Sequence, residues 1–310
     1  MNSRPPGRRT SVPTIPADVD LFGLTHQGHV RTQNEDHFLI ASLHKLLHVQ
    51  RTSLPTEDTA QLVSDSRGYL FLVADGVGGI PDGHLASETV LRTIADYVTN
   101  LMDLYRRLDP AREVEFLEEL AESVRSSHRI LRERSTREHG GKGLATTLTM
   151  VAVLWPRAYL VQVGDSRCYR LRNGQLEQLS RDQTIAQALL DAGALTPEEA
   201  GRSPLRGVLS SAVGGPDASP YTASDDVRRG DVMLLCTDGL TKHVTEGELE
   251  DELNEIVSAE VSCRRLVELA LERGGTDNVT VIIGRLRPKE PTMSWTEGGP
   301  DGDGRVPTAL

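Results

Sequence analysis

Short apolar runs that stop at glycine or aspartate recur along this chain, and longer stretches with helical spacing separate them. The run 70–74 is typical, because it is partly β-branched and leads directly into Asp75 and a glycine-rich turn, DGVGG. Such a run predicts a buried strand that ends in a tight turn. Similar runs predict strands at 19–25, 38–41, 146–154, 158–163, 167–172, 231–237 and 278–284.

Apolar residues recur every three to four positions in two pairs of longer segments, 86–101 with 113–134 and 246–257 with 261–273. This spacing predicts amphipathic helices. Two shorter helices are expected at 185–192 and 197–201. Segment 43–68 is long and mostly polar, and it predicts either an ordered insertion or a flexible loop.

The strands predicted between residues 146 and 172 are joined by very short connections, Trp155-Pro156-Arg157 and Gly164-Asp165-Ser166, and another, Asn173-Gly174, follows the last of them. Connections of this length predict hairpins and therefore an antiparallel sheet. Strands cluster and helices come in pairs, so the class is α+β and not alternating βαβ. Two antiparallel sheets packed together, with a helix pair on each outer face, would form a four-layer αββα sandwich.

The two ends of the chain differ in composition from its centre. Residues 1–17 are rich in Pro, Arg, Ser and Thr, and residues 287–310 in Gly, Pro and Asp, which predicts disordered tails. No linker-like stretch divides 18–286, so one domain is expected there. The N-terminus lacks the apolar core of a signal peptide, and no apolar run approaches membrane-spanning length. A cytoplasmic protein without a membrane partner is therefore expected.

Composition and charge narrow the function. The chain has 310 residues, of which 38% are hydrophobic and 25% charged, and its net charge is −11. This charge argues against nucleic acid or an anionic membrane as the main partner. It leaves an anionic substrate open, because bound cations can invert the local field. The cysteines are odd in number and lack metal-type spacing, which predicts reduced core residues; they are Cys168, Cys236 and Cys263.

Aspartates stand repeatedly at the boundaries of predicted strands, beside glycine or another polar residue. They are Asp36, Asp75, Asp165, Asp238 and Asp277. Taken singly, each is more often part of a turn, and Asp75 would equally suit the cap of the following helix. Gathered at one rim of the sandwich, they would repel one another unless cations neutralised them. Oxygen ligands without clustered Cys or His favour Mg²⁺ or Mn²⁺ over Zn²⁺.

The order and spacing of these motifs resemble the metal-dependent Ser/Thr protein phosphatases of the PP2C (PPM) family, in their bacterial form. The resemblance runs from about residue 19 to residue 286. It implies two Mn²⁺ or Mg²⁺ ions, held by Glu35, Asp75, the Gly76 carbonyl, Asp238 and Asp277. It also implies two catalytic residues, since Asp36 would orient a metal-bound water and Arg31 would clamp the substrate phosphate. Asn278 would support the ligands beside it.

The activity that the resemblance implies is hydrolysis of phosphoserine and phosphothreonine in proteins by a metal-activated water. The expected partners are phosphorylated proteins, the products of a Ser/Thr kinase, and the expected state is a monomer. The alternative is a catalytically weak pseudophosphatase that binds phosphoproteins. The presence of all the acidic residues favours an active enzyme. Another phosphomonoester substrate also stays open, because the motifs recognise the phosphate and the metals alone.

Two positions depart from the family pattern. Val77 stands where many eukaryotic relatives have a histidine thought to protonate the leaving group, so a water would have to supply that proton. Asp165 matches one ligand of a third, weaker metal site, but Lys242 stands where the other ligand is usually an aspartate. An ammonium there would repel a third cation or partly replace its charge. The segment 179–213 matches a mobile flap of bacterial relatives, and its alternative is a simple surface lobe.

Overall fold

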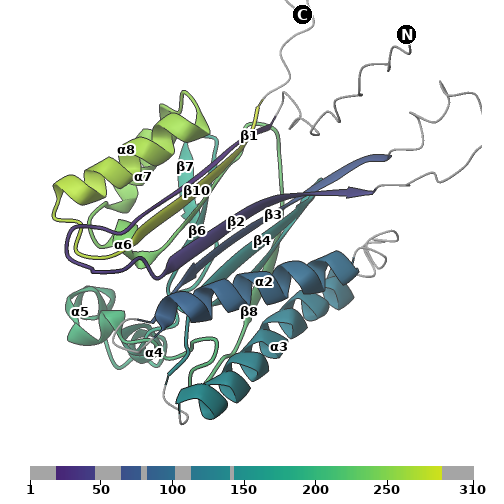
Figure 1. Cartoon of the computed structure of the whole chain (residues 1–310). Coiled ribbons are helices and arrows are strands. Elements are labelled where there is room, and N and C mark those ends of the chain that lie inside the picture. The colour runs from purple at the N-terminus through teal and green to yellow at the C-terminus, as the bar shows by residue number, and fades with distance from the viewer. Residues whose placement is uncertain (1–18, 46–63, 78–81, 102–112, 140–142, 288–310) are drawn as a thin grey trace, which may run out of the picture.

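The structure is a computed structural model that describes residues 19–45, 64–77, 82–101, 113–139 and 143–287. Its strands form two antiparallel five-stranded sheets that pack face to face, and helices cover both outer faces (Figure 1). The predicted α+β sandwich of four layers is therefore confirmed. No helix within the described residues is long and apolar enough to cross a membrane.

The first sheet, here called the β1 sheet, has the strand order β1-β10-β9-β6-β7. Its strands are β1 (Val19–His26), β10 (Val279–Leu286), β9 (Val232–Cys236), β6 (Arg167–Arg172) and β7 (Gln175–Gln178). The second, the β2 sheet, has the order β2-β3-β4-β5-β8. Its strands are β2 (Asp36–Lys45), β3 (Ser64–Asp75), β4 (Leu148–Leu154), β5 (Arg157–Val163) and β8 (Tyr221–Asp226).

Strand β3 shows how the layers are held together. Alternate side chains of a strand point to opposite faces of its sheet. Leu70 and Leu72 pack into the core beneath the helices on the outer face of the β2 sheet. Tyr69, Phe71 and Val73 pack into a different core, between the two sheets. The uninterrupted apolar run of this strand is thus the signature of burial on both faces.

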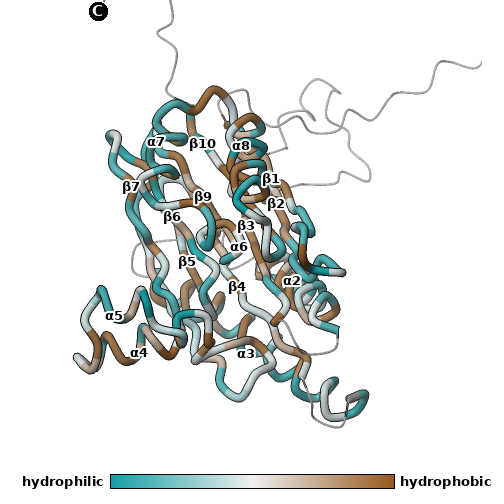
Figure 2. Tube along the Cα trace, turned by 90° about the vertical axis from the view of Figure 1, so that its left-hand side faces the viewer, coloured by the Kyte–Doolittle hydropathy of each residue, from teal (hydrophilic) through white to brown (hydrophobic). Residues whose placement is uncertain are grey.

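Each sheet carries its own pair of helices. The helices α2 (Gly83–Leu101) and α3 (Glu113–His139) cover the β2 sheet. The helices α7 (Glu246–Asn254) and α8 (Ala259–Glu272) cover the β1 sheet, over a third apolar core. The short helices α4 (Ile185–Asp191) and α5 (Pro197–Arg202) lie together at one end of the sandwich (Figures 1 and 2).

One predicted hairpin is wrong. The connection Gly164-Asp165-Ser166 does not fold β6 back onto β5, because β5 pairs within the β2 sheet and β6 within the β1 sheet. Gly164 has a φ of +105°, and a Cβ there would lie 2.7 Å from the Thr147 side chain. This turn therefore carries the chain from one sheet to the other, and it leaves Asp165 where the two sheets meet.

The sequence assigned no range to the edge strands β7 and β8, although the predicted hairpin turn Asn173-Gly174 does join β6 to β7. Their burial alternates between partly buried and exposed positions, and their sequences, QLEQ and YTASDD, have few apolar residues. Segment 43–68 begins and ends as strand, since β2 runs to Lys45 and β3 starts at Ser64. Its centre, 46–63, and the predicted tails, except Arg287, lie outside the described residues. The three cysteines are buried and free, as expected.

Candidate metal centre and active site

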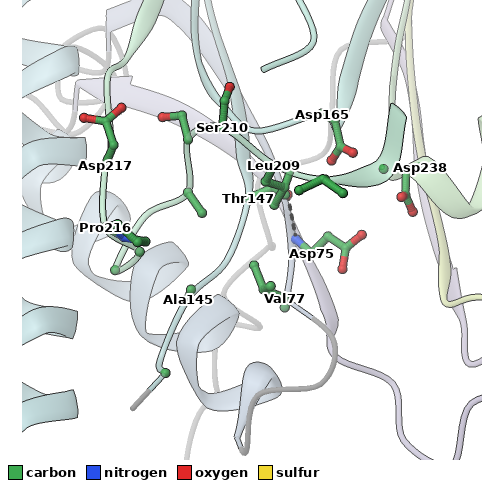
Figure 3. Close-up of a pocket in the computed structure, with 18 of the residues that line it drawn as sticks. Asp75, Val77, Ala145, Thr147, Asp165, Leu209, Ser210, Pro216, Asp217 and Asp238 are labelled. Atoms are coloured by element: carbon green, nitrogen blue, oxygen red, sulfur yellow. Dashed lines mark hydrogen bonds between the residues drawn. The ribbon is translucent and has the colours of Figure 1, made fainter. Parts of the chain in front are cut away.

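A cavity of about 880 Å³ lies where the ends of both sheets approach each other. The predicted site residues that line it are Arg31, Asp75, Gly76, Asp165, Asp238 and Asp277. Figure 3 shows Asp75, Asp165 and Asp238 on one side of this cavity and Pro216 with Asp217 on the opposite side. Aspartates from segments far apart in the sequence therefore face a common space, while Glu35 and Asp36 adjoin it through Gly76 and Asp75.

Asp75 ends strand β3 and is fixed by its neighbours on both sides. Its Cα pairs with that of Asp36 across the β2–β3 ladder, and its backbone N–H donates to the Thr147 hydroxyl at 3.1 Å (Figure 3). The next residue, Gly76, donates its N–H to the Glu35 carbonyl at 3.2 Å. A Cβ on Gly76 would lie 2.6 Å from the Gly83 backbone, so only glycine fits.

Glu35 lies beside the N-terminus of helix α2. A Cβ added to Gly83, the first residue of that helix, would stand 2.8 Å from Glu35 Oε1. Burial raises the pKa of Glu35 above its ordinary value, although the nearby charge of Arg31 and a hydrogen bond from the Gly83 backbone N–H lower it. A helix N-terminus favours a negative charge beside it. A side chain at position 83 would collide with Glu35, which explains the glycine there.

Asp36 is almost fully buried, with 3% of its surface exposed. Its Oδ2 accepts hydrogen bonds from the hydroxyls of Thr237, at 2.8 Å, and Thr280, at 2.7 Å, while its Oδ1 has no partner. Burial raises the pKa of Asp36 to about 7. Thr237 precedes α6 (Asp238–Thr241) but makes no side-chain cap there, because its hydroxyl is used by Asp36.

Asp238 and Asp277 reach the cavity from the ends of adjacent strands. Asp238 begins the one-turn helix α6 just after β9, and Asp277 stands two residues before β10. The helix lies so close to β10 that a Cβ on Gly239 would clash with the Asn278 carbonyl oxygen. Packing thus explains why a glycine follows Asp238: without a side chain at Gly239, α6 can lie against the start of β10 and bring Asp238 close to Asp277.

Asn278 anchors the loop that carries Arg31 and Glu35. Its Nδ2 donates to the carbonyls of Gln27, at 2.8 Å, and Gln33, at 3.0 Å. Its Oδ1 accepts from the backbone N–H of Glu35 at 2.9 Å. One amide side chain therefore holds both ends of the loop against the start of β10.

Two cations of the protein itself neutralise Asp277. The Nε of Arg31 lies 2.7 Å from Asp277 Oδ1, and one terminal nitrogen of the same guanidinium lies 3.0 Å from Oδ2. The Lys242 ammonium lies 2.6 Å from Asp277 Oδ2 and 2.7 Å from Asp238 Oδ2. Burial alone would raise the pKa of Asp277, but these hydrogen bonds hold it below its ordinary value.

The other acids of the cluster have pKa values above the ordinary value, unlike Asp277. Burial, and then the nearby charge of Asp36, raises the pKa of Asp75 well above its ordinary range. Burial also raises the pKa of Asp165 to about 8, and the pKa of Asp238 rises for the same first reason. Buried carboxylates that repel one another bind a cation strongly, because the cation offsets both the cost of burying a charge and the repulsion between like charges.

The donor set fits a hard divalent cation, but the described side chains are not arranged around a single ion in this structure. Asp36 Oδ1 and Asp238 Oδ1 are buried oxygens without hydrogen-bond partners, and oxygen donors suit Mn²⁺ and Mg²⁺. As the side chains stand, no three acidic, histidine or cysteine groups among the described residues are arranged to hold one metal ion. The Lys242 ammonium instead stands between Asp238 and Asp277.

Several residues of the site were not found from the sequence. Thr147, Thr237 and Thr280 orient the acids through their hydroxyls. A weak signal for two of them existed, because Thr237 directly precedes Asp238 and Thr280 follows Asn278 by two residues, in buried strand-like runs. The ion pairs of Lys242 were also missed, since the sequence indicated only that its charge lies near a metal site.

Known proteins share this sequence pattern. The family model described as Protein phosphatase 2C matches residues 48–271. PstP, a serine/threonine protein phosphatase of Mycobacterium tuberculosis, is 37% identical over 216 residues, which are 69% of this chain and 40% of PstP. Protein phosphatase PhpP of Streptococcus pneumoniae is 28% identical over 268 residues, 86% of this chain and 96% of PhpP. The chain thus spans less than half of PstP and nearly all of PhpP.

Solved structures agree with these relatives. The crystal structure of Mycobacterium tuberculosis PstP has a TM-score of 0.69 and 31% identity, over 87% of this chain and 99% of that one. The PstP catalytic domain in complex with two manganese ions has a TM-score of 0.66 and 30% identity, over the same 87% and 99%. The phosphatase MsPP of Mycobacterium smegmatis, in complex with cacodylate, gives 0.63 and 31%, over 86% and 97%. The chain belongs to the protein phosphatase 2C family.

Proposed function

We propose that this chain is a metal-dependent protein phosphatase that hydrolyses phosphoserine and phosphothreonine in proteins. The observation that carries the proposal is the convergence of Asp75, Asp238 and Asp277, from both sheets, on one cavity beside Arg31. Two solved relatives add support, since one holds two manganese ions and the other holds cacodylate, a tetrahedral oxyanion like phosphate.

The metal-holding residues in this proposal are Glu35, Asp75, the Gly76 carbonyl, Asp238 and Asp277. Two Mn²⁺ or Mg²⁺ ions held there would supply a water of lowered pKa and positive charge next to the phosphoryl oxygens. Asp36 would orient that water, because its Oδ1 is free of hydrogen bonds while its Oδ2 is fixed by two threonine hydroxyls. Asp165 is a candidate ligand for a weaker third ion.

Arg31 binds the phosphate of the substrate in this proposal. Its side chain is 40% exposed, lines the cavity and is oriented by its pair with Asp277. A planar guanidinium with several donors suits phosphate oxygens better than a flexible ammonium does. Val77 also lines the cavity and has no proton to give, so solvent supplies the proton that the leaving serine or threonine oxygen needs.

The wider setting follows from the same proposal. Residues 18–286 form the catalytic domain, and the flap 179–213 contains α4 and α5 and reaches the cavity through Leu209 and Ser210. A flap in this place bears on substrate choice and product release. The substrates are proteins phosphorylated by a Ser/Thr kinase, and the enzyme acts as a cytoplasmic monomer in signalling.

Hydrolysis assays test the proposal directly. Wild-type protein with Mn²⁺ is expected to hydrolyse an aryl phosphate and a phosphothreonine peptide, and EDTA is expected to abolish both activities. Asp238→Asn should lose most of the activity, whereas Asp251→Asn, the same change at an exposed position of α7, should keep it. Full activity in EDTA or in Asp238→Asn would refute the metal mechanism. Phosphopeptide binding without turnover would instead support the pseudophosphatase alternative.

A further inference from the structure

Lys242 is placed on the acidic cluster by the geometry of its own helix. It follows Asp238 by four residues, and its backbone N–H donates to the Asp238 carbonyl at 2.8 Å. Side chains four residues apart lie on the same face of a helix. The ammonium therefore reaches Asp238 Oδ2 at 2.7 Å and, across the gap to the start of β10, Asp277 Oδ2 at 2.6 Å. It bridges two carboxylates that belong to different elements.

Asp277 has no free acceptor position in this arrangement. It accepts from Arg31 through two nitrogens, from the Lys242 ammonium, and from the Asn278 backbone N–H at 3.0 Å. A carboxylate offers about four acceptor positions in total. A divalent ion can therefore bind Asp277 only if one donor withdraws. Lys242 is the donor that also covers Asp238, so its withdrawal frees both oxygens at once.

The ammonium also has a place to go. Lys242 lines the main cavity and a neighbouring cavity of about 660 Å³, and its side chain is 38% exposed. The neighbouring cavity is lined by two further acids, Asp165 and Asp182. Asp182 is already paired with Arg167 at 2.7 Å, whereas Asp165 is a buried acid that lines both cavities together with Lys242. Asp165 is thus the nearby carboxylate that a displaced ammonium would approach.

We propose that Lys242 is a resident counter-cation of the metal centre: its ammonium occupies the place between Asp238 and Asp277 in the metal-free protein, and a divalent ion must displace it to bind. The proposal rests on the metal ligands assigned under the proposed function. It has two consequences. The metal-free protein is stabilised, because the ammonium offsets repulsion between the acids. The apparent metal affinity is lowered, because the ion competes with a bound charge.

The test compares Mn²⁺ binding in Lys242→Met, which keeps the length of the side chain and removes its charge, with wild type. Titration calorimetry is expected to show Mn²⁺ affinity higher on the order of tenfold in the variant, a typical coupling between two sites. The melting temperature in EDTA should fall, so the rise on adding Mn²⁺ should be larger. Lys242→Arg keeps the charge and should stay close to wild type. Arg264→Met removes an exposed ion pair with Glu260 on α8 and is the matched control.

A second measurement uses the unmodified protein and does not depend on the folding of any variant. Acetylation of lysines, read by mass spectrometry, is expected to label Lys242 faster when Mn²⁺ is added, because the ammonium leaves its ion pairs. The other lysines, Lys45, Lys142 and Lys289, serve as internal standards. Labelling of Lys242 that is unchanged or slower with bound Mn²⁺ would overturn the proposal.

The outcomes separate this inference from the proposed function. Equal or weaker Mn²⁺ affinity in Lys242→Met, in a protein that binds Mn²⁺ and hydrolyses phosphopeptides, would overturn the role of Lys242 and leave the phosphatase intact. Tighter Mn²⁺ binding in the variant without turnover in either protein would support the role of Lys242 and count against the activity. Failure of every form to bind Mn²⁺ would refute both.

Discussion

Single acidic residues of one chemical type behave differently here because their surroundings differ. Asp277 keeps a pKa below its ordinary value through Arg31 and Lys242, whereas burial and its acidic neighbours raise the pKa of Asp75. The sequence identified both as strand-end aspartates, since each follows or precedes an apolar run. It could not assign their charge state, because the deciding partners, Lys242 among them, meet Asp277 only after folding.

Asn278 offers a test at this scale, because one side chain makes three hydrogen bonds to the loop of Arg31 and Glu35. Asn278→Ala is expected to lower kcat/KM on a phosphopeptide at least tenfold and to cost about 1–3 kcal/mol of unfolding free energy, since buried donors lose their partners. Enzyme kinetics and urea unfolding measure the two effects. Asn254→Ala, which removes one exposed bond to the Gly174 carbonyl, is the control. Equal kinetics in the two variants would contradict this role.

His128 predicts a pH dependence of stability. Its Nδ1 accepts the Gly214 N–H at 3.0 Å, and burial, followed by the charge of Arg132, lowers its pKa below the ordinary 6.5. The unfolded chain therefore binds a proton at His128 more readily than the folded chain does. The stability that neutral His128 contributes is complete above about pH 6.5 and is lost as the pH falls through its pKa in the folded state. Urea unfolding between pH 7.5 and 5 is expected to show a smaller loss for His128→Gln than for wild type. Identical losses would exclude the effect.

At the scale of elements, strands buried on both faces were predicted well because their apolar runs are uninterrupted, and amphipathic helices because their apolar residues recur with helical spacing. The edge strands β7 and β8 received no range, because their sequences are short and mostly polar, unlike those of the other two edge strands, β1 and β2. The turn at Gly164 was predicted as a hairpin from its length alone. Length does not tell which sheet the next strand joins, since that depends on partners such as β9, far away in the sequence.

The contact between α6 and β10 leads to a prediction about one glycine. Gly239→Ala would place a Cβ against the Asn278 carbonyl, so α6 and Asp238 would have to move away from β10. The variant is expected to lose most activity and several kcal/mol of unfolding free energy, as strained core substitutions do. Gly247→Ala, on α7 with nothing within 4 Å of the added Cβ, should be neutral or slightly stabilising. Urea unfolding of both variants decides; similar stability would show that α6 has room to adapt.

At the scale of the whole molecule, the sequence predicted the layered class and the set of acids, whereas the assembly of those acids depends on both sheets. Asp36 and Asp75 come from the β2 sheet, and Asp238 and Asp277 adjoin the ends of β9 and β10 in the β1 sheet. Their meeting is a property of how two sheets pack. No local pattern encodes it: the strand-end positions of the acids allowed a shared rim, and the resemblance to a family selected the acids that would share the metals.

Metal binding should therefore stabilise the entire fold. Mn²⁺ at about 100 times its dissociation constant is expected to add about 2.7 kcal/mol to the unfolding free energy, because the ion binds only the folded chain. Differential scanning fluorimetry should show this as a rise in Tm that EDTA reverses. The rise should shrink in Asp238→Asn and persist in Asp251→Asn. An unchanged Tm of the wild type on addition of Mn²⁺ would contradict a metal centre at this cavity.

The division of the acidic residues between two stacked sheets makes the proposed catalytic site sensitive to sliding of one sheet over the other. If one sheet slid past the other by a single residue, about 3.3 Å, the acids of the two sheets would no longer point at the same ions. Octahedral ions such as Mg²⁺ tolerate far smaller errors in ligand position. A shift of one helix-covered half against the other would therefore abolish the proposed activity without blocking the cavity or altering a single carboxylate.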